Sequence, residues 1–238
     1  KSTRQPCKSK AGPAADQLPE PKAFGDALTA DHKTLNEEDA SREDDQNCCI
    51  IKDRWSQFFR SYPAPTKDKK QTKWAFQRFL GPQGKCKHVY TDNSGELEAA
   101  LSELELSHDT STPHRPETNA VAERCVRKVK EGTSCALSQS GLSEYWWKEA
   151  MMCYCFLATV VEPLLGGHTA YFRRFQVDYK GPIIPFGAQI HYLPITHKDK
   201  KRNHQFGNKL LSGSFMGYEE HAGGGWAGDL HILDWEEL

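Results

Sequence analysis

The spacing of apolar and polar residues divides the chain into a region of mixed strands and helices and a strand-rich tail. We expect strands within residues 23–34, at two adjacent segments between residues 48 and 62, and at residues 88–91. Apolar residues at three- and four-residue spacing predict helices over residues 67–80, 96–106, 117–138 and 143–161. Pro63 and Pro65 are expected to end the second of the adjacent strands, and residues 107–116 and 163–184 to be irregular.

The tail has a different pattern, with short strands separated by glycine-rich turns from Pro185 onward. Residues 1–22 lack periodicity and are basic, which is typical of a linker or arm. We therefore predict a basic arm over 1–22, an α/β domain over 23–162, a connector over 163–184 and a small all-β barrel over 185–238.

Composition limits the class of protein. The 238 residues carry 31 Lys and Arg against 32 Asp and Glu, a net charge of −1, which excludes a polycation that coats nucleic acid but permits local basic patches. No apolar run approaches the ~20 residues that span a bilayer, so we expect no membrane partner. The chain begins at Lys1 without a Met, so we expect a fragment of a longer product.

The eight cysteines indicate reduced thiols and an intracellular protein. Cys48, Cys49, Cys153 and Cys155 lie in apolar stretches, where cysteine behaves as a small buried hydrophobe, and no CxxC pair is present. Cys7 alone has a polar, basic context and is interpreted as a possible remnant of an upstream zinc motif.

Three acids are candidates for metal chemistry because of their expected structural settings. Asp31 falls in the first strand, Asp92 at a strand end and Glu123 early in the long helix. Three converging carboxylates could hold two divalent cations for an in-line phosphoryl displacement. Arg127 and Lys130 follow Glu123 on the same helix face, where they could position a phosphate backbone. The alternative is an ordinary solvated helix face with charge pairing.

The segments that contain these acids resemble the integrase catalytic core of copia-type retroelements. Residues 89–97 (VYTDNSGEL) are similar to the strand end of that family, and residues 111–124 (STPHRPETNAVAER) to its helix start. Residues 185–192 and 215–218 resemble the SH3-like barrel that follows the core. The resemblance implies an α/β fold: an RNase H-like mixed five-stranded sheet flanked by helices, plus the C-terminal SH3-like barrel.

The same resemblance implies a D,D,E site in which Asp31, Asp92 and Glu123 are catalytic and bind two Mg²⁺ or Mn²⁺ ions. Asp26 competes with Asp31 for the first position, and we prefer Asp31. Ala120 stands where the family has Gly, and the 31 positions from Asp92 to Glu123 are a slightly short interval.

The expected DNA contacts lie on the Glu123 helix, in the loop before it and in a barrel loop. They are Arg127, Lys130, His114, Arg115, Lys198, Lys200, Lys201 and Arg202.

The function that follows is metal-dependent 3′-end processing and strand transfer, with element-end DNA and target DNA as partners. We expect a homo-oligomer that acts in the nucleus without a small-molecule cofactor. Two alternatives remain open: a catalytically decayed DNA-binding or assembly domain, and an RNase H-like nuclease that acts on other nucleic acids.

Overall fold

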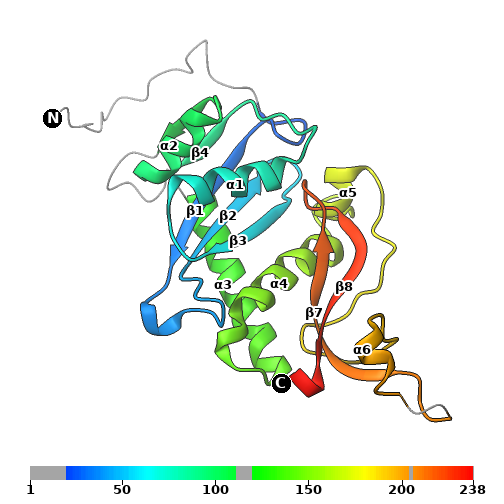
Figure 1. Ribbon diagram of the computed structural model, residues 1–238. Helices are drawn as coiled ribbons and strands as arrows, with labels where there is room; N and C mark the ends of the chain where they lie inside the picture. The colour runs from blue at the N-terminus through cyan, green and yellow to red at the C-terminus, as the bar shows by residue number, and fades with distance from the viewer. Residues whose placement is uncertain (1–19, 111–119, 204–205, 238) are drawn as a thin grey trace, which may run out of the picture.

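The computed structural model describes residues 20–110, 120–203 and 206–237 (Figure 1). A mixed sheet of five strands in the order β3-β2-β1-β4-β5 forms its centre. The strands are β1 (Leu28–Thr34), β2 (Asn47–Asp53), β3 (Phe59–Ala64), β4 (Val89–Thr91) and β5 (His108–Thr110). β1, β2 and β3 are antiparallel, whereas β4 pairs in parallel with both β1 and β5.

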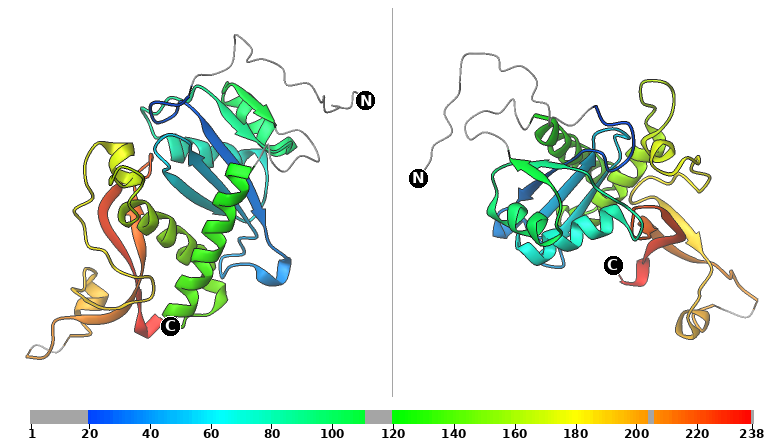
Figure 2. Two further views of the ribbon diagram at one scale, coloured as in Figure 1. Left: turned by 180° about the vertical axis from the view of Figure 1, so that it is seen from behind. Right: turned by 90° about the horizontal axis from the view of Figure 1, so that it is seen from above.

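Helices cover both faces of this sheet (Figure 2). They are α1 (Lys69–Leu80), α2 (Gly95–Glu103), α3 (Ala120–Ser140) and α4 (Trp147–Val161), with a 3₁₀ turn, Glu144–Trp146, before α4. Alternation along β2 separates the two faces, because Ile50 packs with Val129 of α3 while Ile51 belongs to the cluster of Phe76 and Phe79 of α1. The predicted mixed five-stranded sheet flanked by helices is therefore confirmed.

Several boundaries differ from the sequence-based expectation. β3 continues through Pro63, which an edge strand tolerates because one side of its backbone is unpaired. β5 lies inside the predicted irregular segment 107–116 and is polar, so it gave no apolar signal. α2 ends at Glu103, and Glu105 adopts a φ of 54° two residues later. The predicted start of the long helix, residues 117–119, lies outside the described residues.

The C-terminal part is a three-stranded antiparallel sheet, which is compatible with the predicted SH3-like barrel. Its strands are β6 (Gln189–Tyr192), β7 (Leu211–Glu220) and β8 (Trp226–Asp234), in the order β6-β7-β8. Two short helices were not expected: α5 (Ala170–Phe175) lies in the predicted connector, and α6 (His197–Lys200) means that the tail is not all β.

This sheet packs on the α/β part through a shared apolar core. Phe215 and Tyr218 of β7 belong to the same buried cluster as Phe156 of α4. The rings of Phe156 and Tyr218 stack with their centroids 4.2 Å apart. The buried guanidinium of Arg60, in β3, binds the Glu220 carboxylate at the end of β7 and donates to the Gly224 carbonyl at 2.9 Å. The two sheets therefore form one packed unit.

All seven cysteines in the described ranges are free thiols, and Cys48, Cys49, Cys153 and Cys155 are buried as predicted. Cys7 lies outside the described residues. Within residues 20–110, 120–203 and 206–237, no helix is both long and apolar enough to cross a membrane.

Candidate functional site

The register of the central strands brings two of the candidate acids side by side. β1 and β4 are parallel, with Ala30 opposite Thr91. Asp31 and Asp92 are each the next residue along, so they leave the paired region at the same edge of the sheet. Ser94 and Gly95 then begin α2, which turns the chain away from Asp92.

Glu123 reaches the same region from the first turn of α3. This helix packs across β1 and β2 through Cys125 and Val129, which are buried. Glu123 lies on the exposed side of the helix, and Arg127 and Lys130 are exposed as well, one and two turns further on. The expectation that these three residues share an exposed stripe is consistent with the structure.

Electrostatic coupling ties the three acids together. The pKa of Asp31 is raised to about 6. Burial is the largest cause, and the negative charges of Asp92 and Glu123 contribute to the same rise. Burial also raises the pKa of Asp92, whose Oδ1 atom is buried without a hydrogen-bond partner. Mutual repulsion and an unpartnered carboxylate oxygen are features that a bound cation relieves.

The donor set fits a hard cation, although it is not closed around one. The three side chains offer only carboxylate oxygens, which Mg²⁺ and Mn²⁺ prefer. Within the described residues, no three His, Cys, Asp or Glu side chains are already arranged to hold a metal ion. Strand register therefore places Asp31 beside Asp92, but the structure does not bring the three carboxylates together as a formed metal site.

Asp26, the competitor of Asp31, is engaged elsewhere. Its carboxylate accepts hydrogen bonds from the backbone N–H groups of Lys22 and Ala23 and pairs with Lys87 Nζ at 2.7 Å. These contacts lower the pKa of Asp26 and hold it in the turn before β1. Asp31 is thus the acid of this segment that faces Asp92.

His32 does not extend the carboxylate site. Its Nε2 atom lies 3.1 Å from the Thr72 hydroxyl of α1. Burial, assisted by the positive charge of Lys67, lowers the pKa of His32 to about 4. His32 is therefore a neutral imidazole packed under α1.

The predicted DNA contacts of the tail divide into two groups. Lys198, Lys200 and Lys201 are exposed in and just after α6. Arg202 instead donates to both carboxylate oxygens of Asp234, at 2.6 and 3.1 Å, and pairs with Glu236 at 2.8 Å. Its guanidinium therefore links α6 to the end of β8 and is not free for phosphate. His114 and Arg115 lie outside the described residues.

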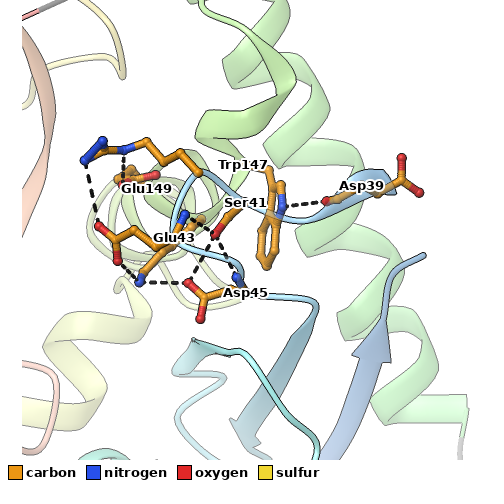
Figure 3. Close-up of polar contacts among 8 residues, drawn as sticks. Asp39, Ser41, Glu43, Asp45, Trp147 and Glu149 are labelled. Carbon is orange, nitrogen blue, oxygen red and sulfur yellow. Dashed lines mark hydrogen bonds and ion pairs between the residues drawn. The ribbon is translucent and has the colours of Figure 1, made fainter. Parts of the chain in front are cut away.

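The acidic segment after β1 is structural. Lys148 Nζ pairs with Glu43 and with Asp45, at 2.5 and 2.8 Å (Figure 3). Trp147 donates its indole N–H to the Asp39 carbonyl at 3.0 Å, and Arg42 lies 3.6 Å from Glu149. These contacts fix the long β1–β2 connection to the start of α4, and they explain acids that composition alone left unassigned.

A basic cavity that borders α3 escaped the sequence reasoning. It is lined by Lys52, Arg54, Arg124 and Lys128, together with Glu162 and apolar residues. Two of these residues gave a signal, because Arg124 and Lys128 are separated by four positions on one helix face. Lys52 gave none, since it is a single cation at the end of a buried strand.

Comparison with known proteins gives relatives of one kind. No protein-family model matches the chain. The chain is 32% identical over 179 residues to the retrovirus-related Pol polyprotein from transposon RE2 of Arabidopsis thaliana, which covers 71% of the chain and 12% of that protein. It is 31% identical over 133 residues to the corresponding polyprotein from transposon RE1 of the same plant, which covers 53% of the chain and 9% of that protein. The chain thus spans about a tenth of these relatives.

Solved structures share the fold at lower identity. A simian T-cell lymphotropic virus intasome, solved with the PP2A regulatory subunit B56 gamma, aligns with a TM-score of 0.55 and 13% identity over 92% of the chain and 80% of its own. The HTLV-2 integrase catalytic core with magnesium aligns with a TM-score of 0.49 and 16% identity over 63% of the chain and 97% of its own.

The mixed sheet with helices on both faces gives the chain the RNase H-like fold that it shares with this intasome structure. By sequence, the chain is a homologue of one segment of retrotransposon Pol polyproteins.

Proposed function

We propose that the chain is the catalytic and C-terminal part of a retrotransposon integrase that processes 3′ DNA ends and joins them to target DNA. The observation that carries the proposal is the coupling of Asp31 with Asp92 and Glu123 at one edge of an integrase-type sheet. Element-end DNA and target DNA are the substrates, the active form is a homo-oligomer, and the site of action is the nucleus.

In this proposal the three carboxylates hold two divalent cations. Bound cations would supply Lewis-acid activation of the attacking oxygen and stabilise the leaving oxygen. Asp31 and Asp92 fix the cation position from adjacent strands, and Glu123 completes the set from α3. Arg127 and Lys130 align the phosphate backbone along the same helix.

The chemistry is two successive displacements at phosphorus. Water attacks a phosphodiester near the element end, the P–O bond to the 3′ oxygen breaks, and a 3′ hydroxyl is released. That hydroxyl then attacks a target phosphodiester, so a new P–O bond forms while the target strand loses its own 3′ oxygen as a hydroxyl. Neither step needs an oxidant, a reductant or a further cofactor.

The test is the Mg²⁺-dependent joining of a labelled, 3′-recessed element-end duplex to plasmid DNA. The protein should form joined product, and Glu123→Gln should reduce it by at least 100-fold. Glu131→Gln, an exposed acid on the same helix, is the matched control and should keep full activity. Equal background from the unmodified protein and Glu123→Gln would instead identify a decayed DNA-binding domain. Cleavage without dependence on the end sequence would identify a general nuclease.

A further inference from the structure

A cavity of about 480 Å³ lies on the flank of α3. Its walls come from the end of β2, the β2–β3 turn, the first turns of α3 and the end of α4. Arg124 lines it and directly follows Glu123, so one turn of α3 presents an acid toward the candidate metal site and a cation toward the cavity.

Positive charge dominates this cavity. Lys52, Arg54, Arg124 and Lys128 line it, against the single carboxylate of Glu162. Lys128 forms an ion pair with Glu162 and lies 5.2 Å from the Phe59 ring centroid. In the described ranges, no carboxylate approaches Lys52, Arg54 or Arg124 within 4 Å. Three uncompensated cations therefore face one cavity, in a chain whose net charge is −1.

Lys52 lies close enough to the other cations of the cavity to be repelled by them. Its side chain is half-buried at the end of β2. Burial lowers the pKa of Lys52, and the positive charges of Lys128 and Arg124 lower it further. An anion in the cavity would oppose all of these effects, whereas an apolar or cationic ligand would add to them.

The lining also selects the kind of anion. Arg54 and Arg124 are exposed and carry the planar fork of donors that matches phosphate oxygens. The aromatic side chain of the cavity, Phe59, is buried and lies under Lys128, so it gives no platform for a base. Recognition here is suited to backbone phosphate rather than to nucleobases.

We propose that this basic cavity is a second DNA site, in which Lys52, Arg54 and Arg124 bind backbone phosphates of the duplex that passes the carboxylates. The choice of DNA as the polyanion rests on the proposed function. The cavity lies on the flank of α3 adjacent to the Arg127 and Lys130 stripe, so the first turns of this helix contact DNA on two sides.

The experiment measures DNA binding without chemistry. Fluorescence anisotropy follows a labelled duplex with EDTA present, between 50 and 200 mM salt, for the unmodified protein and Arg54→Gln/Arg124→Gln. Both arginines are exposed, so the double variant should fold normally, which circular dichroism checks. Loss of two phosphate contacts predicts about tenfold weaker binding at 50 mM salt and a slope of log K against log salt that is shallower by about 1.8.

A matched control removes the same charge elsewhere. Lys85→Gln/Lys180→Gln replaces two exposed lysines outside the cavity and should leave the slope within about 0.5 of the unmodified value. Lys52→Gln, with a measured unfolding curve, provides an independent variant and should lower the slope by about 0.9. Equal slopes for the cavity and control variants would overturn the proposal, as would tighter binding of an RNA duplex through the same residues.

The outcome is separable from that of the proposed function, because binding in EDTA needs no active carboxylate site. If joining fails while the cavity variants still reduce the slope, the second site stands and the integrase reaction does not. If joining succeeds and the slopes are unchanged, the reverse holds.

Discussion

Asp31 lies in the middle of β1, and two further acids act on it: Asp92, just after the neighbouring strand β4, and Glu123, in α3. A buried carboxylate with adjacent negative charge retains its proton to higher pH, which is why its pKa reaches about 6 instead of the ordinary 3.8. Sequence reasoning could select Asp31 because it falls in the expected first strand, within a segment that resembles the strand supplying the first acid of the family. It could not show the strength of the coupling, which depends on the register of β1 with β4.

Asp31→Asn should stabilise the metal-free protein at neutral pH. The folded pKa lies above the unfolded one, so stability decreases as pH rises from about 4 to about 6 and stays low above it. Removing the charge should raise the free energy of unfolding at pH 7.5 by up to about 3 kcal/mol, and by almost nothing below pH 4. Thermal unfolding in EDTA measures this.

Two comparisons make the Asp31 result specific. Asp178→Asn, at an exposed position, is the matched control and should change the free energy of unfolding at pH 7.5 by less than about 0.5 kcal/mol. Adding Mg²⁺ should raise the melting temperature of the unmodified protein but not that of Asp31→Asn, since a ligand stabilises only the state that binds it. A destabilised Asp31→Asn at pH 7.5 would contradict the proposed repulsion.

At the scale of elements, the turn that begins β1 depends on a glycine. Gly25 has a φ of +85°, donates its N–H to Asp53 and accepts from Lys87. A Cβ atom there would lie 2.0 Å from the Lys85 carbonyl oxygen. This turn leads directly into the strand that carries Asp31, so its geometry sets the register of the candidate site.

Gly25→Ala should therefore destabilise the protein by at least about 2 kcal/mol, because positive φ and a backbone clash act together. Gly95→Ala is the matched control: it stands at the start of α2, nothing lies within 4 Å of its Cβ position, and it should be neutral or slightly stabilising. Urea unfolding compares the two. Equal effects would mean that the turn is not constrained.

Element prediction succeeded where apolar periodicity was strong and failed where it was short. The strands β1 to β4 and the helices α1 to α4 were all expected near their observed places. β5 is a three-residue polar strand, so only its pairing with β4 identifies it. α5 has six residues, and a Thr169 cap that is visible only in the structure begins it. Such elements are created by tertiary contacts rather than by local pattern.

At the scale of the whole molecule, the C-terminal sheet was expected to be a barrel appended to the α/β part. A buried ion pair between Arg60 and Glu220 instead joins the two parts. Arg60 is 3% exposed and also donates to the Thr159 hydroxyl of α4 at 2.8 Å. Its partner Glu220 lies 160 residues later, so no local pattern could have paired them. The basic cavity was missed for the same reason, because its cations come from two segments far apart in the sequence: the end of β2 with the turn after it, and α3.

Removing one partner of this buried pair should cost about 3–5 kcal/mol, because the other charge stays buried and unpaired. Arg60→Met and Glu220→Met should each show this loss in urea unfolding, and the double variant should recover a large part of it. Lys73→Met, which removes one partner of an exposed pair with Glu103, should cost less than about 1 kcal/mol. Additive losses in the double variant would show that the two residues act independently.

The apolar core shared by α4 and β7 fixes the position of the C-terminal sheet relative to the α/β part. With Phe156 stacked on Tyr218, the C-terminal sheet cannot swing about a hinge relative to the strands that carry Asp31 and Asp92. The lysines of α6 are held next to that sheet, because Arg202, just after α6, donates hydrogen bonds to Asp234 at the end of β8. In the proposed integrase, the distance between the tail lysines and the carboxylates would therefore be fixed within one chain, and with it the length of DNA that reaches from one to the other.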